Sequence, residues 1–316
     1  MTDRFGREIT YLRLSVTELC NLRCLYCMPE EGVPKKRHED MLTEDEMIRA
    51  VEAASSLGIR KLRITGGEPL VKPNILSICR RAAQVSGITD LALTTNGLRL
   101  PEMAEELHDA GVRRLNISLD TLKPERYARI TRTGSLDQAL QGIESALHAG
   151  FAKIKLNTVL IGSFNDDEIH ALADLTRRWP VDVRFIELMP MPGNAAFGPE
   201  AFIPSSRVTD LLPEAVPQGR DGVARLYRLP GAQGCIGLIS PLSSHFCSEC
   251  SRLRLTADGY LKPCLHARAE ICLKGLDLQG MKQAMQQAVD MKPRQHDPLS
   301  ATERSQAGRS MNQIGG

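Results

Sequence analysis

Short apolar strands alternate with amphipathic helices along the first 190 residues, and this alternation constrains the fold more than any other feature. Six strand segments occur in order: YLRLSV, KLRIT, LALTT, RRLNISL, KIKLNTVLI and DVRFIEL. In the first helical segment between them, Thr43 and Glu46 predict a capping box and Gly58 predicts the C-terminal stop. A strand–helix rhythm favours a parallel sheet, which fits either a doubly wound sheet or an incomplete barrel.

Polar motifs follow four of these strands. They are TGGEP at 65–69, TTNG at 94–97, SLD at 118–120 and ELMP at 187–190. The carboxyl ends of parallel strands are where α/β folds place their chemistry, and many strand ends that converge on one site suit a barrel. Gly, Asn and Pro could instead simply mark turns, which accounts for TTNG better than for TGGEP.

Positive charges interrupt the strands. Arg13, Arg63, Lys155 and Arg184 each stand in the middle of a run that should be apolar if both faces of the sheet are covered. Carboxylates such as Glu187 could pair with some of these cations, and cations near strand ends can reach the rim. Four such cations together favour a polyanionic ligand in the barrel mouth, because arginine geometry suits phosphate oxygens.

The character of the sequence changes after Met189. A Pro/Gly-rich connector predicts a boundary between a barrel at 1–190 and a second region at 191–295. That region contains a short helix near SSRVTDLL, strands near ARLYRL and CIGLIS, and a helix near LQGMKQAMQQAVDM. The polar tail at 296–316 should be mobile unless it docks.

The nine cysteines are grouped. One triad is Cys20, Cys24 and Cys27, and a second is Cys247, Cys250 and Cys264. Cys79 and Cys235 stand in apolar surroundings and should be buried hydrophobic side chains. The first triad is one ligand short of a structural zinc site, but three thiolates can hold three irons of a [4Fe–4S] cluster. The fourth iron would then be open to a small molecule with adjacent amine and carboxylate groups.

The second triad leaves two interpretations open. With His266 or Cys272 as a fourth ligand it fits a zinc site, and without one it fits a second iron–sulfur cluster. Arg252 and Arg254 follow Cys250 closely and favour a site that also binds an anion.

Bulk composition excludes some classes of function. The net charge is +2 and aromatic residues make up 4%, which argues against a nucleic-acid-binding protein or a membrane-surface protein. The charged N-terminus has no apolar core of a secretory signal, and no apolar run approaches the length of a membrane span. We therefore expect a cytoplasmic protein with reduced thiols.

The combination C-x3-C-x-aromatic-C followed by GGEP resembles the radical S-adenosylmethionine superfamily. Within it, FCSECSRLRLTADGYLKPCL, LRITGGEPL, LTTNGL, NISLDTL, RFIELMP and the terminal MNQIGG resemble the GTP 3′,8-cyclase family over nearly the whole chain. The resemblance implies an α/β fold, an incomplete (βα)6 TIM-like barrel with a C-terminal α+β region. It also implies two [4Fe–4S] clusters, S-adenosylmethionine, and conversion of GTP to a 3′,8-cyclised nucleotide in molybdenum cofactor synthesis.

The same resemblance implies partners and residue roles. An electron donor such as flavodoxin or ferredoxin, a downstream cyclic pyranopterin monophosphate synthase and a homodimer are expected. The two triads would bind the two clusters. By motif, the S-adenosylmethionine residues would be Tyr26, Gly67, Ser118 and Met189, and the GTP residues Arg13, Arg63, Thr94, Lys155, Arg252 and Arg254. Arg184, Gly315 and Gly316 would take part in catalysis, with the terminal glycines entering the active site rather than serving as a conjugation handle.

Two rival functions remain from sequence. One is a peptide-modifying radical enzyme, which usually has more C-terminal cysteines and needs no set of phosphate-binding cations. The other is a zinc-dependent nucleic-acid-binding protein that uses the second triad, which the charge and aromatic content disfavour.

Overall fold

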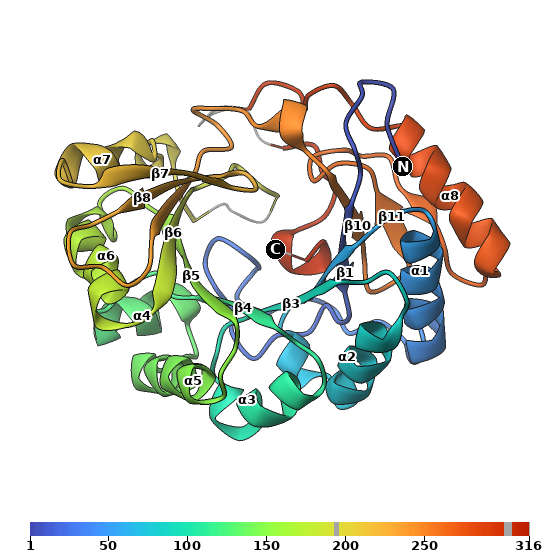
Figure 1. Ribbon diagram of the computed structural model, residues 1–316, viewed down its shortest axis with the longest axis horizontal. Coiled ribbons are helices and arrows are strands. Elements are labelled where there is room, and N and C mark those ends of the chain that lie inside the picture. Colours follow the sequence, from blue (N-terminus) through green and yellow to red (C-terminus); the bar gives the residue numbers. More distant parts are fainter. Residues whose placement is uncertain (193–195, 300–304, 316) are drawn as a thin grey trace.

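The computed structural model describes residues 1–192, 196–299 and 305–315. Its centre is an arc of parallel strands with the helices on the outer side, as Figure 1 shows. The six strands predicted from sequence are all present: β1 (Tyr11–Ser15), β2 (Lys61–Thr65), β3 (Asp90–Thr95), β4 (Arg114–Ser118), β5 (Lys153–Leu160) and β6 (Val181–Glu187). They pair in chain order and in parallel. The fold is therefore the incomplete barrel rather than the doubly wound sheet.

Six helices cover the outside of this arc. They are α1 (Glu44–Ser56), α2 (Ile75–Gln84), α3 (Leu100–Asp109), α4 (Pro124–Thr131), α5 (Leu136–His148) and α6 (Ile169–Arg178). The capping box predicted for α1 is present, because Thr43 accepts from the Glu46 amide and Glu46 binds back to Thr43. The sequence analysis missed α4, a two-turn helix that begins at Pro124.

The C-terminal region extends the same sheet at both edges. Its elements are α7 (Ser206–Leu211), β7 (Val216–Asp221), β8 (Ala224–Arg228), β9 (Ile236–Ile239), β10 (Arg252–Leu255), β11 (Tyr260–Lys262), β12 (Ile271–Cys272) and α8 (Leu278–Asp290). β9 pairs in parallel with β6, and β10 pairs in parallel with β1. The predicted boundary at residue 190 is thus no break in the sheet, whose order is β12-β11-β10-β1-β2-β3-β4-β5-β6-β9-β8-β7.

Short 3₁₀ turns complete the secondary structure. They lie at His38–Asp40, Pro69–Val71, Asp166–Glu168, Pro199–Ala201, Cys247–Glu249 and Met311–Gln313. Among the helices that the structure describes, none has the length and apolar character needed to cross a lipid bilayer.

The strands alternate in character, which explains the cations noted in the sequence. Leu12, Leu14, Leu62 and Ile64 point outward into the core between sheet and helices and are fully buried. The residues between them point inward, so that Arg13 lies beside both Arg63 and Arg254 in the strand register. The main hydrophobic core is therefore a layer outside the arc, and the interior is polar.

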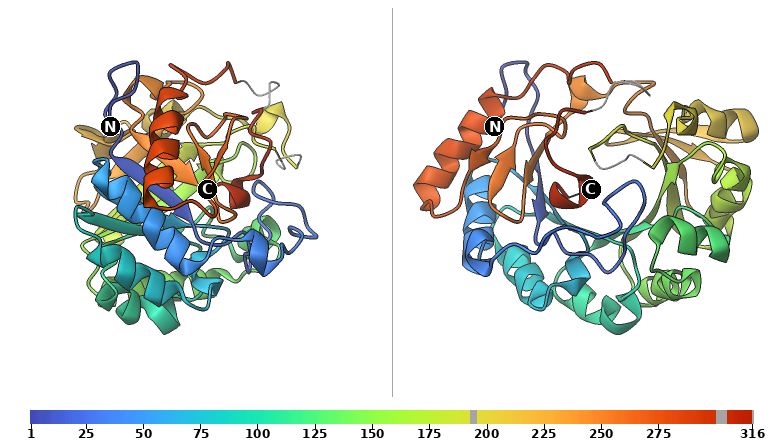
Figure 2. Two further views of the ribbon diagram at one scale, coloured as in Figure 1. Left: turned by 90° about the vertical axis from the view of Figure 1, so that its right-hand side faces the viewer. Right: turned by 180° about the vertical axis from the view of Figure 1, so that it is seen from behind.

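The end of the chain docks inside the arc. The last described residues lie near the centre of the ring in Figure 1 and in the right view of Figure 2. Ala307 and Ile314 are buried against Met191, and the Ser305 amide donates to the Pro190 carbonyl. The sequence predicted a tail that is mobile unless it docks, and residues 305–315 are docked. They dock because apolar side chains spaced along this polar segment pack against buried residues.

Helix α5 approaches the turn after β3 so closely that it has no room for a side chain. A Cβ atom on Gly142 would lie 2.1 Å from the Gly97 carbonyl oxygen. Gly97 itself has a φ of +84°, which favours glycine in that turn.

We expect Gly142→Ala to destabilise the protein, although alanine has the higher helix propensity. The propensity gain is at most about 1 kcal/mol, whereas overpacking against a backbone carbonyl costs about 1–3 kcal/mol or more. The melting temperature should fall by several degrees. The exposed neighbour Gln141 gives the control variant Gln141→Ala, which should melt within about 2 °C of the parent. Equal melting of both variants would contradict the close packing.

Candidate active site

A cavity of about 540 Å³ lies within the arc, and both cysteine triads line it. The other predicted site residues line it as well: Tyr26, Gly67, Ser118, Met189, Arg13, Arg63, Thr94, Lys155, Arg184, Arg252 and Arg254. Gly315 is buried against Thr65 and Arg254 at the cavity wall. Gly316 lies outside the described residues. One space is therefore shared by side chains that are widely separated in sequence.

The first cysteine loop leaves β1 and is fixed by backbone hydrogen bonds. The carbonyl of Cys24 accepts from the amides of Cys27 and Met28, which forms a tight turn. The amides of Arg23 and Leu25 donate to carbonyls at the end of α4, so this unpredicted helix holds the loop against the barrel.

The thiols of the first triad are poor acids in this environment. Burial raises the pKa of Cys20 to about 11 and that of Cys27 to about 12, and it raises the pKa of Cys24 well above its ordinary range. Such thiols become thiolates only when a bound cation compensates the charge. Three neighbouring buried thiols with this property fit the ligand set of an iron–sulfur cluster.

The GGEP segment contacts the start of the cysteine loop. A Cβ atom on Gly67 would lie 2.4 Å from the Leu19 carbonyl oxygen, so only glycine fits there. The buried Glu68 carboxylate accepts from the Leu70 and Asn96 amides and from the Thr95 hydroxyl. Burial raises the pKa of Glu68 to about 7 despite these bonds. Glu68 thus joins the loops after β2 and β3.

Tyr26 and Asp120 form a second polar contact at the carboxyl ends of the strands. The Tyr26 hydroxyl donates to Asp120 Oδ2 at 2.8 Å, and Asp120 Oδ1 accepts from the Val159 amide. Burial raises the pKa of Asp120 to about 6. The aromatic residue of the cysteine motif is therefore anchored to the SLD motif after β4.

The second triad has the opposite electrostatic character at one thiol. Burial alone would raise the pKa of Cys250, but the charges of Lys292 and Arg252 outweigh it and lower that pKa to about 7. Lys292 is fully buried and donates to the carbonyls of Arg252 (2.8 Å) and Pro263 (2.7 Å). Arg7 donates to the Cys247 carbonyl at 2.7 Å. Sequence reasoning missed both supporting cations.

The zinc alternative for the second triad does not fit the geometry. Among the described residues, no three His, Cys, Asp or Glu side chains are arranged to hold one metal ion. His266 contacts Ser305 Oγ at 2.8 Å, and Cys272 is exposed on β12. In a four-iron cluster each thiolate binds a different iron, so its three sulfurs need not converge on one point.

The partner of two strand cations is an unexpected carboxylate. Lys155 Nζ and Arg184 Nη2 both lie 2.5 Å from Asp221 Oδ2, at the end of β7. Glu187, the carboxylate that the sequence offered as a possible partner, is instead buried among the amides of Ser205, Leu242 and Ser243. Nothing in the sequence marks Asp221, because β7 reaches the cavity only through its pairing at the far edge of the sheet.

The cavity wall carries excess positive charge. Burial would raise the pKa of the Tyr11 phenol, yet the charges of Arg63, Arg13, Arg252 and Arg254 outweigh it and lower that pKa. Burial lowers the pKa of Arg254 to about 10, with Arg252 adding to the effect. A field of this sign favours an anionic ligand.

Several side chains that line this wall have polar atoms left over. Within the described part of the chain, these buried atoms lack a hydrogen-bond partner: Arg63 Nε, Thr94 Oγ1, Asn116 Oδ1 and Asn157 Oδ1. Buried polar groups in native proteins are normally satisfied. The cavity therefore suits a ligand that has both anionic and neutral polar groups.

The docked tail reaches both the cysteine loop and the cation wall. The Asn312 amide donates to the Cys27 thiol, and the Asn312 side chain donates to the Glu18 carbonyl at 3.2 Å. Arg254 donates to the carbonyls of Ile314 (3.2 Å) and Gly315 (2.8 Å). A Cβ atom on Gly315 would lie 2.2 Å from Thr65 Oγ1, so the close approach requires glycine.

The class of protein comes from comparison with known families. Residues 14–176 match the radical SAM superfamily, and residues 181–298 match the family described as Molybdenum Cofactor Synthesis C. The first of these matches covers the end of β1, the strands β2 to β5 and the first cysteine triad, and the second match covers the second triad.

Curated relatives narrow the class. The chain is 46% identical to the GTP 3′,8-cyclase of Alkaliphilus metalliredigens and 47% identical to that of Pelotomaculum thermopropionicum, with all of both chains covered in each case. It is also 47% identical to the GTP 3′,8-cyclase of Peptoclostridium acidaminophilum, over all of this chain and 98% of the relative. The chain therefore belongs to the radical SAM superfamily and, within it, to the GTP 3′,8-cyclase family.

Solved structures support the fold. The SuiB protein of Streptococcus suis bound to its precursor peptide SuiA aligns with a TM-score of 0.67 at 14% identity, over 87% of this chain and 64% of that one. The [FeFe]-hydrogenase maturase HydG aligns with a TM-score of 0.51 at 17% identity, over 66% of this chain and 49% of that one. At these identities the likeness concerns the fold alone.

The buried Lys155 should make anion binding depend on pH. Burial, with the nearby Arg184 charge, lowers the pKa of Lys155 to about 8, so its positive charge is present below that pH and lost above it. We expect the affinity for inorganic triphosphate to fall by up to about fivefold between pH 8 and pH 9. Isothermal titration calorimetry measures it. The control is Lys155→Arg, which stays charged over this range, so any pH dependence of its binding comes from ionisation of the triphosphate. The same pH dependence in both proteins would contradict the titration of Lys155.

Proposed function

We propose that this protein is a lyase that cyclises GTP to (8S)-3′,8-cyclo-7,8-dihydroguanosine 5′-triphosphate, the first step of molybdenum cofactor synthesis. The observation that supports it most is the joint placement of two thiol triads and a cationic wall around one cavity. A protein that binds only S-adenosylmethionine needs one triad and no such wall.

The residues around the first triad would bind the groups that take part in electron transfer. Cys20, Cys24 and Cys27 would bind the first [4Fe–4S] cluster, and Tyr26, Gly67, Ser118 and Met189 would surround S-adenosylmethionine at its open iron. When bound and reduced, this pair supplies a carbon-centred radical that can remove a hydrogen atom from the ribose of GTP. The tight contact of Gly67 with the cysteine loop fixes the distance between the two motifs.

The residues at the other side of the cavity would hold GTP. Arg13, Arg63, Thr94, Lys155, Arg252 and Arg254 would bind its phosphates and polar groups, and Cys247, Cys250 and Cys264 would bind a second cluster that faces guanine. Arg184 lies beside Lys155 through their shared partner Asp221. Both cations would have to exchange this carboxylate for substrate, or share it, when the nucleotide binds.

The partners follow from this chemistry. We propose a one-electron donor such as flavodoxin or ferredoxin, and a cyclic pyranopterin monophosphate synthase that takes the product. A cytoplasmic setting supports both triads, because cluster ligands must stay reduced. A homodimer is also proposed from the family, and sedimentation of the cluster-loaded protein tests it.

Cys24→Ala should abolish cleavage of S-adenosylmethionine, because the first cluster loses a ligand. The measurement is 5′-deoxyadenosine formed by anaerobically reconstituted, dithionite-reduced protein. The matched control is Cys79→Ala, which removes a buried thiol in α2 that lies outside the cavity. The parent and the control should hold about eight irons and the variant about half of that. Parent-level 5′-deoxyadenosine from Cys24→Ala would refute the assignment.

Deletion of Gly315 and Gly316 should suppress the cyclised nucleotide while leaving folding and iron content unchanged. The reason is that Gly315 contacts Thr65 and Arg254 at the cavity wall and no other residue fits there. Chromatography of the nucleotide products gives the yield, and the melting temperature and iron content are the controls. Parent-level product from the truncated protein would show that the terminal glycines have no catalytic part.

A further inference from the structure

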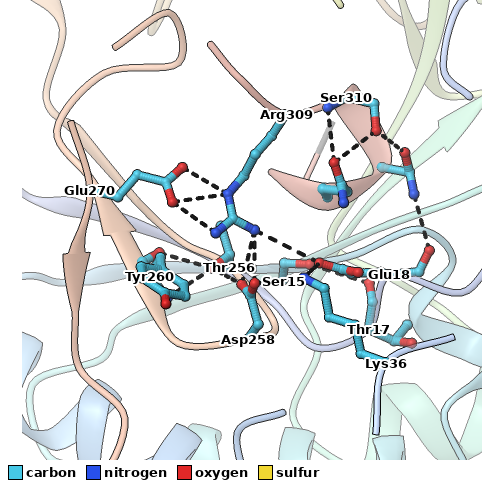
Figure 3. Close-up of polar contacts among 12 residues, drawn as sticks. Ser15, Thr17, Glu18, Lys36, Thr256, Asp258, Tyr260, Glu270, Arg309 and Ser310 are labelled. Carbon is cyan, nitrogen blue, oxygen red and sulfur yellow. Dashed lines mark hydrogen bonds and ion pairs between the residues drawn. The ribbon is translucent and has the colours of Figure 1, made fainter. Parts of the chain in front are cut away.

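The tail is attached to the rest of the molecule at one arginine before it enters the cavity. Figure 3 shows Arg309 between Glu270 on one side and Asp258 on the other. Its Nε and Nη2 atoms lie 2.8–3.0 Å from the Glu270 carboxylate, and its Nη1 atom lies 2.9 and 3.1 Å from the two Asp258 oxygens. The guanidinium also lies over the Tyr260 ring, 5.0 Å from its centre. All of these bonds are charge-assisted, the strongest kind a side chain makes.

Arg309 completes a balanced set of charges. Lys36 donates to Asp258 at 2.6 Å and to Glu18 at 2.7 Å, as Figure 3 also shows. The fully buried Lys262 donates to Glu270 at 2.8 Å. Three carboxylates thus face three cations, and loss of Arg309 would leave a buried excess of negative charge. Carboxylates in such a cluster repel one another without their cation.

The position of this cluster connects the tail to the first cysteine motif. Glu18 is two residues before Cys20, and its carbonyl accepts from the Asn312 side chain. Between Arg309 and Asn312, Ser310 caps the last turn: its amide donates to Gln313 Oε1, and its hydroxyl donates to Asn312 Oδ1 at 2.7 Å. A short, internally bonded turn therefore links the charged cluster to the residues that enter the cavity.

Ion pairs on the protein surface would not hold the tail in place, because they contribute little to stability. The Arg309 side chain is only 15% exposed, and its partners come from the turn after β10 and the segment before β12 rather than from its own neighbours in the chain. The cluster thus fixes the tail to the C-terminal region on one side and to the cysteine loop on the other.

We propose that Arg309 is a positioning residue. Its guanidinium forms a fork of ion pairs with Asp258 and Glu270 that holds the terminal turn in place, so that Asn312 stays against Cys27 and Gly315 stays against Arg254. The proposal rests on the proposed function only in its catalytic consequence. The structural part concerns the order of 310–315 and stands on the contacts above.

Hydrogen exchange of the full, cluster-loaded chain tests the structural part without substrate. Arg309→Gln should speed exchange of the amides of Asn312, Gln313 and Ile314 by about tenfold or more. The reason is that the tail of this variant can open without breaking the ion pairs of residue 309 with Asp258 and Glu270. Arg309→Lys keeps the charge but not the fork, so it should give an intermediate rate. The matched control is Arg126→Gln on α4, where an arginine also bridges two carboxylates, Asp167 and Glu168, away from the cavity. It should leave these amides unchanged.

Product analysis tests the catalytic part. Arg309→Gln should lower the ratio of cyclised nucleotide to 5′-deoxyadenosine by about 10- to 100-fold, because small displacements of positioning groups have effects of this size. The iron content and the yield of 5′-deoxyadenosine should stay at the parent level, although the melting temperature should fall because two buried carboxylates lose their cation. Arg309→Lys should recover part of the ratio. A residue that only stabilised the fold would lower both products together.

The outcomes separate the two proposals. Parent-level exchange of the tail in Arg309→Gln overturns the positioning role, whatever the activity. Fast exchange with an unchanged product ratio also overturns it, since the tail would then be free without consequence. If the parent itself forms no cyclised nucleotide from GTP, the proposed function fails, while the exchange data still decide whether Arg309 orders the tail. If Arg309→Gln does not fold, Arg309→Lys carries both measurements.

Discussion

Positive charge buried in the interior of an open sheet is the feature on which the rest of this molecule depends. In-register parallel pairing places Arg13 beside Arg63 and Arg254, so that a face usually filled by aliphatic side chains is instead cationic and polar. Such an interior cannot pack by itself. It needs anions, and among the described residues Asp221 supplies one to both Lys155 and Arg184. An anionic ligand in the cavity would add further compensation. The stability of the barrel is therefore left to the aliphatic layer between the strands and the outer helices.

The two thiol triads share a cavity but differ in their electrostatics. Buried thiols next to Asp120 and to one another resist ionisation in the first triad, whereas Lys292 and Arg252 lower the pKa of Cys250 in the second. At Cys250 the second site thus favours the thiolate, whereas burial raises the pKa of Cys264 in the same triad. This difference fits a division in which one side of the cavity transfers an electron and the other side holds an anionic nucleotide.

Local patterns in the sequence predicted the parts of the fold that local interactions determine. The six barrel strands, five of the six barrel helices and the capping box of α1 follow from periodicity and from side chains within a few residues, and both triads follow from spacing. Asp221, Lys292 and Arg7 were not predictable in the same way, because each reaches the site only through long-range pairing or packing. Glu187, which the sequence offered as one possible partner for the cations, has another role for the same reason: its carboxylate accepts from backbone amides of a distant loop.

The pairing of β1 with β10 also affects how the chain can fold during synthesis. The edge of β1 that faces away from β2 stays without a neighbour until the ribosome has made residues 252–255, so a nascent barrel presents an open strand edge for most of translation. Arg13 on that strand stays close to solvent over the same period, which makes the exposed edge a poor template for association with other chains. A polar lining that serves the finished cavity thus also protects the unfinished one.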